Sequence, residues 1–292
     1  MLRLIGLGLS VDFIPLGNLK KLLTCDKIIV DSYTSVWFPH IGILIRLLSN
    51  IKKEVVVAKR DMLEGKAIDS ILGESTKKDV CIAVIGDPLI ATTHHTIVVE
   101  ALKKGIEIDI SPATSIFNTA ISISCLQAYK FGKIATIVSS KNGIVYEYPL
   151  IVLKNNRSQN LHTLFLLEVD VEHGYYMKPN EAVKTLIDIQ KRQGEDVLSN
   201  NDIVVVIADA LSDRQRILVL KTEEVIKKEF IENTLYTLII PAKNLHPVEE
   251  ECLKLLHNKE LYKPALNETD LDNISKSLLG KANCNSDEFT PY

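Results

Sequence analysis

The stretch Val80-Cys81-Ile82-Ala83-Val84-Ile85-Gly86-Asp87-Pro88, residues 80–88, decides the fold class. Its apolar run does not alternate with polar residues, which is typical of a strand covered on both faces in a helix-flanked parallel sheet. The run stops at Gly86, and a carboxylate and a proline-stiffened turn follow. Because ligands bind beyond the carboxyl ends of strands in open α/β sheets, Asp87 stands where a ligand would lie. A helix cap or an Asx turn is the alternative use of this side chain.

Similar β-branched runs recur on both sides of this stretch, with helix-period segments between them. The predicted strands are residues 2–5, 27–30, 54–57, 80–85, 106–110, 134–138, 163–167, 203–207, 217–220 and 235–240. Alternation of strands and helices predicts an α/β fold. A first helix is predicted to carry Leu16, Leu19 and Leu23 on one face. The three last runs are close-set, with Ser212-Asp213-Arg214 as a hairpin-like connection, so the second half is predicted to hold a mixed sheet.

A domain boundary is predicted at Ser111-Pro112-Ala113, where a proline ends one strand and a helix follows. This gives an N-terminal α/β domain over 1–111 with a mostly parallel sheet, and a C-terminal α/β domain over 112–261. Residues 262–292, rich in Asn, Asp, Ser and Lys, are predicted to form a loosely ordered tail. A length of 292 residues suits two domains.

The composition excludes several classes of protein. With 46% hydrophobic residues the chain is not intrinsically disordered, and a formal net charge of −3 lacks the basic surplus of a nucleic-acid binder. The apolar run 40–51 contains Arg46 and is shorter than the ~20 residues that a membrane helix needs. No secretory signal precedes the first strand. We therefore expect a cytoplasmic protein that binds neither membranes nor nucleic acid directly.

The cysteines and histidines predict no metal site. The five cysteines lie far apart without a CxxC pair, which favours reduced thiols in the core over a disulfide framework or a zinc site. His94 and His95 are adjacent, and adjacent side chains on a helix point in different directions.

Two further segments end predicted strands with small residues. Residues 4–10 run into a Gly-x-Gly turn, whose glycines permit positive φ and close approach of a ligand. Val11 stands where a dinucleotide fingerprint has its third glycine, which counts against a nicotinamide-dependent oxidoreductase. Residues 111–117 place hydroxyl side chains at a helix start, where exposed N–H groups bind polar ligand groups. The residues alone predict a ligand-binding α/β enzyme without a Ser-His-Asp triad or a Walker loop.

An ordered set of motifs over nearly the whole chain before the tail resembles the diphthine synthase family of the tetrapyrrole methylase superfamily. The matching segments are residues 1–10, 33–35, 86–88 with 91–94, 113–116, 126–127 with 131–132, 161–167, and 245–246 before Glu249. The resemblance implies a two-domain tetrapyrrole methylase-like fold and a homodimer. It also implies S-adenosyl-L-methionine as cofactor, folded into an interdomain cleft and released as S-adenosyl-L-homocysteine.

Carried over position by position, the resemblance implies eight cofactor-binding residues. They are Leu9, Asp87, Ile90, Ser115, Ile116, Leu167, Ala210 and Tyr236. Core packing is the alternative for the apolar members. Three residues depart from the family pattern: Asp209 replaces the usual Arg, Leu211 the usual Gly, and Tyr236 the usual His. These departures leave a catalytically altered cofactor-binding paralogue open as an alternative, beside a methylase of a small tetrapyrrole.

The family's reaction is repeated methylation of the 3-amino-3-carboxypropyl arm on a histidine of elongation factor 2, a step of diphthamide biosynthesis. The methyl sulfonium is already activated, so holding it in near-attack geometry is expected to supply most of the acceleration. No catalytic residue is assigned; His162 is a candidate general base, with a structural role as the alternative. Residues 141–148 or 174–178 are expected to face the protein acceptor, and the choice between three and four methyl transfers stays open.

Overall fold

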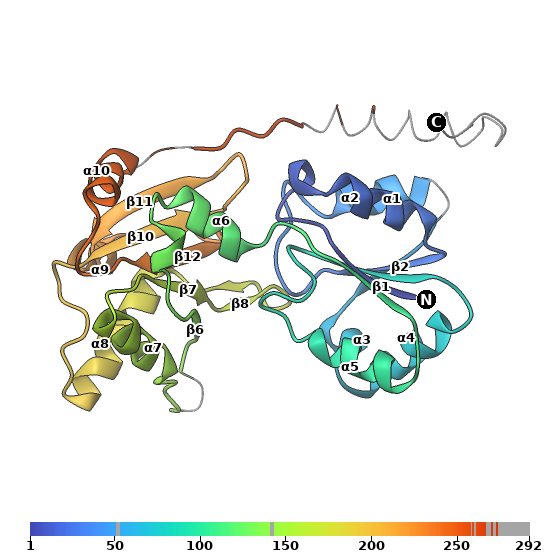
Figure 1. The fold of residues 1–292 in the computed structure, drawn as a ribbon, viewed down its shortest axis with the longest axis horizontal. Coiled ribbons are helices and arrows are strands. Elements are labelled where there is room, and N and C mark those ends of the chain that lie inside the picture. Colours follow the sequence, from blue (N-terminus) through green and yellow to red (C-terminus); the bar gives the residue numbers. More distant parts are fainter. Residues whose placement is uncertain are drawn as a thin grey trace. The chain divides into compact units, whose positions relative to one another are not determined.

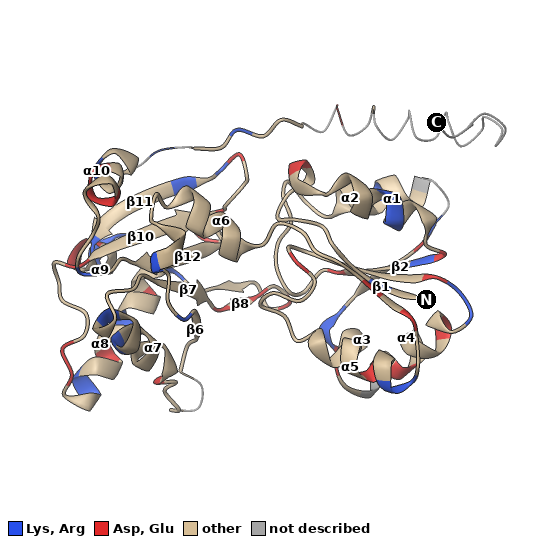
Figure 2. Ribbon diagram, in the orientation of Figure 1, with Lys and Arg blue, Asp and Glu red and all other residues tan. Residues whose placement is uncertain are grey.

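The computed structural model describes residues 1–50, 53–140, 143–257, 259, 261–266, 270 and 273. The chain divides into two compact units, residues 1–115 with 264–292 (unit 1) and residues 116–263 (unit 2). Most of the predicted tail, 262–292, lies outside the described residues. Figure 1 shows the elements in chain order, and Figure 2 shows that acidic and basic residues are spread over the described elements of both units.

Unit 1 is built on a five-stranded parallel sheet with the strand order β3-β2-β4-β1-β5. Its strands are β1 (Leu2–Gly6), β2 (Lys27–Asp31), β3 (Glu54–Ala58), β4 (Val80–Val84) and β5 (Ile108–Ser111). Strand β4 is central and buried at every residue, as its continuous apolar run predicts. The predicted parallel sheet is confirmed.

Helices cover both faces of this sheet, as Figure 1 shows. One face carries α1 (Leu16–Thr24) and α2 (Gly42–Asn50), and the other carries α3 (Arg60–Leu63), α4 (Ile68–Ser75) and α5 (His95–Lys103). The residues of β4 alternate between the two cores: Cys81 and Ala83 pack in the α1–α2 core, and Val80, Ile82 and Val84 pack in the other. Both cores are therefore anchored on one strand.

Unit 2 is built on a mixed sheet with the order β11-β10-β12-β7-β6. Its strands are β6 (Ala135–Ile137), β7 (Thr163–Leu167), β10 (Ile203–Ala208), β11 (Arg216–Lys221) and β12 (Tyr236–Ile240). Only β6 and β7 are parallel among these pairs, and the predicted hairpin between β10 and β11 is confirmed. A ribbon of β8 (Val169–Asp170) and β9 (Tyr175–Tyr176) was not predicted, because strands this short carry no periodic signal.

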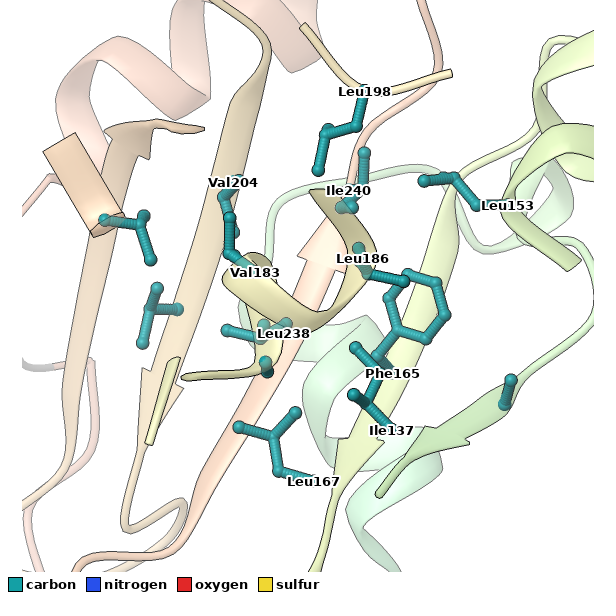
Figure 3. Packing of buried hydrophobic residues seen from close by; sticks show 14 of the residues in the cluster. Ile137, Leu153, Phe165, Leu167, Val183, Leu186, Leu198, Val204, Leu238 and Ile240 are labelled. Atoms are coloured by element: carbon teal, nitrogen blue, oxygen red, sulfur yellow. The ribbon is translucent and has the colours of Figure 1, made fainter. Parts of the chain in front are cut away.

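Unit 2 has five α-helices among its described residues: α6 (Ile116–Ile123), α7 (Tyr148–Ser158), α8 (Pro179–Gln193), α9 (Thr222–Lys227) and α10 (Pro247–Leu256). Of these, α7, α8 and α9 contribute side chains to one large core. The core unites side chains from strands and helices that are far apart in sequence, among them Phe165 of β7, Leu186 of α8 and Leu238 of β12 (Figure 3). Among the described residues there are also three short 3-10 helices: η1 (Val11–Phe13) and η2 (Gly65–Ala67) in unit 1, and η3 (Ala128–Lys130) in unit 2.

In the structure Cys25 lies against Cys81 and Cys125 lies against Cys252, so these four cysteines form two close pairs that the sequence analysis did not foresee. The Cα atoms of each pair lie 6.0 Å apart, within the range that a disulfide spans. Sequence spacing could not reveal the pairs because the partners are 56 and 127 residues apart. Cys284 lies outside the described residues.

Two searches of the described residues bear on membranes and metals. None of their helices combines the length and the apolar character needed to cross a membrane. The same residues hold no group of three or more His, Cys, Asp or Glu side chains that could bind a metal ion.

Candidate functional site

The carboxyl ends of three neighbouring strands in unit 1 carry four of the eight predicted cofactor-binding residues. Leu9 follows β1, Asp87 and Ile90 follow β4, and Ser115 follows β5. These strands are parallel and adjacent in the order β4-β1-β5, so their following loops lie at one edge of the sheet. The side chain of Ile90 is 39% exposed there, which is unusual for isoleucine and leaves an apolar surface for a ligand.

Asp87 joins two of these loops. One carboxylate oxygen accepts the N–H of Leu89 at 3.0 Å, and the other accepts the N–H of Ala113 at 3.2 Å. The first bond is the Asx-turn contact that the sequence allows, and the second ties the β4 loop to the β5 loop. Each oxygen of an ionised carboxylate has a second acceptor position, so the buried side chain keeps the capacity to bind a ligand donor.

Gly8 and Gly86 join the β1 loop to the β4 loop. The N–H of Gly8 donates to the Gly86 carbonyl at 3.2 Å, and the N–H of Gly86 donates to the Gly8 carbonyl at 2.9 Å. Both residues have positive φ, 68° and 79°, which glycine adopts without a steric penalty. The glycines that the sequence analysis singled out therefore shape the edge of the sheet.

Gly6 allows the three loops to approach one another. A Cβ atom at this position would lie 2.6 Å from Ala113 Cβ and 2.8 Å from the Gly86 carbonyl oxygen. We expect Gly6→Ala to lower the free energy of unfolding by about 1–3 kcal/mol, because two loops would have to move apart. Urea denaturation followed by circular dichroism measures this. Gly17→Ala is the matched control: a Cβ there meets no atom within 4 Å, so equal losses in both variants would contradict the prediction.

Asn18 was missed by the sequence analysis. From helix α1, its buried Nδ2 donates to the carbonyl oxygens of Gly6 at 2.8 Å and Pro112 at 3.0 Å, and lies 3.3 Å from that of Ser111. Helix α1 thus holds the ends of β1 and β5 together beneath the loops that carry Leu9 and Ser115. Because α1 also contains Lys20, Lys21 and Thr24, the sequence held no signal that singled out Asn18.

His94, which ends the Ala-Thr-Thr-His motif, holds the turn that carries Asp87. Its ring is buried, with Nδ1 3.2 Å from the Pro88 carbonyl oxygen and Nε2 3.5 Å from Asp31 Oδ2. The Thr92 hydroxyl donates to the same carbonyl at 3.0 Å. His94 therefore connects the Gly-Asp-Pro turn to the end of β2.

In unit 2, three more predicted residues lie at one edge of the mixed sheet. Leu167 ends β7, Tyr236 begins β12, and Ala210 follows β10. Strand β12 is antiparallel to both neighbours, so its first residue lies beside their ends; Tyr236 pairs with Ala208. The eighth residue, Ile116, begins helix α6 directly after Ser115.

The side chain of Tyr236 is occupied within unit 2. Its hydroxyl donates to the Ile231 carbonyl at 3.3 Å and accepts the Ile231 N–H at 3.1 Å. The ring packs edge-on against Phe230 with centroids 5.5 Å apart. Burial raises the pKa of the Tyr236 phenol. Where the family pattern has a histidine, this side chain thus holds the segment before β12.

His162 is a structural histidine by geometry. The ring is fully buried, its Nδ1 accepts the Ala242 N–H at 2.9 Å, and its Nε2 lies 3.0 Å from Glu249 Oε1. Because Nδ1 accepts, Nε2 carries the hydrogen and donates it to the carboxylate. Burial lowers the pKa of His162 and Glu249 acts against this. With both ring nitrogens bonded inside the protein, the residue does not suit the role of general base.

The two segments expected to face a protein acceptor differ in structure. In the first, Lys141 and Asn142 lie outside the described residues, while Ile144, Tyr146 and Tyr148 expose large parts of their side chains. The second segment contains β9, so it is partly a strand. The exposed group at 144–148 is the larger apolar surface of the two.

Comparison with known proteins places this geometry in a family. The model of the tetrapyrrole (corrin/porphyrin) methylases matches residues 1–226. The chain belongs to the tetrapyrrole methylase family. It is 38% identical over 257 residues to a diphthine synthase of Saccharolobus solfataricus, which covers 87% of this chain and 97% of the relative. It is 39% identical over 255 residues to a diphthine synthase of Staphylothermus marinus, covering 87% of this chain and 92% of the relative.

A solved structure agrees with this placement. A crystal structure of diphthine synthase superposes with a TM-score of 0.77 at 30% sequence identity, covering 88% of this chain and 95% of that chain. The predicted tetrapyrrole methylase fold and the resemblance to diphthine synthases are confirmed. Tetrapyrrole methylases use S-adenosylmethionine as methyl donor, and this chain is a diphthine synthase-like methyltransferase of that family.

Proposed function

We propose that this chain methylates the 3-amino-3-carboxypropyl arm on a histidine of elongation factor 2, in diphthamide biosynthesis. The observation that carries the proposal is its likeness to diphthine synthases, at 38% and 39% identity over 87% of the chain. The ordered motifs support it further, because Asp87 lies in the loop after β4 at one edge of the parallel sheet and His94 lies against the turn that carries it.

We propose that S-adenosylmethionine binds to the eight residues that the resemblance indicated. Four of them lie at the carboxyl edge of the unit 1 sheet and three at one edge of the unit 2 sheet, with Ile116 at the start of α6. The available groups suit this cofactor: carboxylate acceptors at Asp87 for hydroxyl or ammonium groups, and a buried amide donor at Gln215 for an acceptor atom. The exposed Ile90 offers apolar contact.

The cofactor supplies an activated methyl group when bound, so the protein has to orient and desolvate rather than activate. Positioning of donor and acceptor contributes up to about 7–11 kcal/mol to such reactions. Asp87 would hold the donor, and the ties from Asp87, Gly8 and Asn18 keep its loop in place. No side chain is assigned as general base, and His162 is not proposed for that role.

We further propose that the enzyme works as a homodimer in the cytoplasm, where its acceptor protein takes part in translation. The exposed side chains of Ile144, Tyr146 and Tyr148 would contact elongation factor 2. Cell fractionation tests the location directly. Close cysteine pairs stay reduced in a reducing compartment, so counting alkylated thiols in protein taken from cells tests the location independently.

Radiolabelled S-adenosylmethionine and elongation factor 2 from cells lacking this activity test the function. We expect label on the modified histidine, and the mass of the product distinguishes three methyl groups from a four-methyl product that includes an ester. Cofactor binding without transfer would favour the catalytically altered paralogue, and transfer to a small tetrapyrrole would favour the other alternative. Failure to bind the cofactor at all would contradict the proposal.

A further inference from the structure

The turn between β10 and β11, residues 209–215, has a strained backbone. Asp209 has a φ of 41° and Leu211 a φ of 61°, in the left-handed region that L residues with a Cβ atom adopt at a cost of roughly 1–2 kcal/mol each. Such strain persists only where neighbouring contacts impose it, and it clusters at ligand-binding sites. Ala210, between the two strained residues, is one of the proposed cofactor contacts.

Asp209 fixes this turn to the start of β12. Its N–H donates to the Leu235 carbonyl at 2.8 Å, and its Oδ1 accepts the Leu235 N–H at 2.9 Å. Its Oδ2 pairs with Nη2 of Arg214 at 3.0 Å. The carboxylate is buried, so the acidic residue does not place a negative charge on the surface. It sets the position of Ala210 relative to Tyr236, the residue after Leu235.

Gln215 closes the turn and carries a donor that is not used. The side chain is 1% exposed, and its Oε1 accepts the N–H of Leu211 at 2.9 Å. This bond identifies the oxygen end of the amide, so Nε2 is the opposite end. Among the residues that the structure describes, Nε2 has no hydrogen-bond acceptor. A buried donor without a partner costs about 1–3 kcal/mol, which indicates an acceptor that belongs there.

A second buried glutamine of unit 2 shows the contrast. Gln190 of α8 accepts the Leu198 N–H through Oε1 at 2.9 Å and donates to the Leu198 carbonyl through Nε2 at 3.0 Å. Both ends of that amide are therefore satisfied by the protein. Gln215 uses only its acceptor end in the same way, so among the described residues its donor end is left without an acceptor.

We propose that Gln215 is a further ligand-binding residue, whose Nε2 donates to an acceptor atom of S-adenosylmethionine, and that Asp209 is the positioning residue of this turn. The inference rests on the proposed function. Ala210 belongs to the same turn, and Tyr236 follows the residue that Asp209 binds. The cofactor's carboxylate, ribose oxygens and adenine nitrogens are all acceptors. Asp209 and Leu211, which differ from the family pattern, then belong to a turn that binds the cofactor. They are not signs of a site that has lost its function.

The test measures the dissociation constant of S-adenosylhomocysteine by titration calorimetry, which requires no turnover. Gln215→Glu keeps an acceptor for the Leu211 N–H but loses the donor, and Gln215→Leu loses both. We expect both variants to bind roughly tenfold more weakly than wild type, the size of one buried hydrogen bond. Gln190→Leu is the matched control: it should lower the melting temperature and leave the dissociation constant unchanged.

The outcomes separate this inference from the proposed function. If wild type fails to bind, the proposed function is wrong. If wild type binds and folded Gln215→Glu binds equally well, the amide donor contacts no ligand and the inference is overturned, whatever Gln215→Leu does.

Asp209 is tested by the same titration together with steady-state kinetics. In Asp209→Ala the dissociation constant and the KM for the cofactor should both rise several-fold. The value of kcat should fall by a smaller factor. Asp209→Asn keeps an acceptor for the Leu235 N–H and should restore most of the affinity. If both variants lose the same melting temperature and keep the wild-type dissociation constant, Asp209 only stabilises the fold.

Discussion

Replacing Asp87 with alanine should weaken binding of S-adenosylmethionine by roughly 10–150-fold while the protein remains folded. The estimate is that of one hydrogen bond to a charged group, about 1.5–3 kcal/mol. The variant also loses the bonds from the Leu89 and Ala113 N–H groups, which fix the β4 and β5 loops. Calorimetric titration with S-adenosylhomocysteine measures the loss, and thermal unfolding reports whether the fold survives.

Two further variants separate the ligand role of Asp87 from its turn role. Asp87→Asn keeps one acceptor oxygen and should bind with intermediate affinity. Asp26→Ala removes a carboxylate that accepts the Asp79 N–H at 2.8 Å before β2, at the opposite edge of the same sheet, and should leave affinity unchanged. Wild-type affinity in folded Asp87→Ala would show that this carboxylate serves the turn alone.

Replacing Glu249 with alanine should destabilise unit 2 by about 3–5 kcal/mol, the loss typical of breaking a buried ion pair. This carboxylate is 1% exposed. It accepts from Lys130 Nζ at 2.6 Å, from the N–H groups of Gln127 and His246 at 2.8 Å each, and from His162 Nε2 at 3.0 Å. All four donors would lose this acceptor, and Lys130 Nζ would keep its bond to the Asn244 carbonyl at 3.1 Å. Urea denaturation measures the change, and Glu250→Ala, which breaks an exposed pair with Lys254, should cost less than about 1 kcal/mol.

The pKa of the Glu249 carboxylate predicts that the free energy of unfolding decreases at acid pH. Burial acts to raise the pKa of Glu249, but hydrogen bonds from Lys130 and from the Gln127 and His246 N–H groups outweigh it and hold the pKa at about 2. The unfolded value is near 4.5, so the carboxylate stabilises the fold above that pH, and the contribution is lost as pH falls toward 2. A shift of this size corresponds to about 3 kcal/mol. In Glu249→Gln the free energy of unfolding should change less between these pH values than it does in wild type. An equal loss of stability in both proteins would contradict the assignment.

The fold could be predicted from the sequence because its signals are local. The continuous apolar run of β4 requires cover on both faces, and a strand followed by Gly86 and Asp87 places polar groups at the carboxyl edge whatever surrounds it. The same reasoning placed residues 4–10 and 111–117 at strand ends, and the family resemblance singled out Leu9 and Ser115 within them. The choice of helix face was wrong in one case: Leu16, predicted on the packed face of α1, is 83% exposed. The helix docks through Asn18 and Leu22 instead.

The details of the site could not be predicted because their partners are distant in sequence. Asn18 bonds a carbonyl 94 residues away, Asp209 bonds an N–H 26 residues away, and Glu249 meets Gln127 across 122 residues. The sequence showed that residue 209 is acidic where the family pattern has an arginine, but it could not show that the fold buries this carboxylate beside Arg214. Local patterns thus identify which strand ends carry the ligand groups, whereas tertiary pairing decides which of those groups remain available.

The reciprocal Gly8–Gly86 hydrogen bonds and the Asp87–Ala113 bond have a thermodynamic consequence for recognition. Loops already fastened to each other lose little freedom when a small molecule settles on them, so less of its contact energy is spent on ordering. Unit 1 should therefore present a nearly rigid surface to its ligand, and the affinity should depend on the contacts themselves.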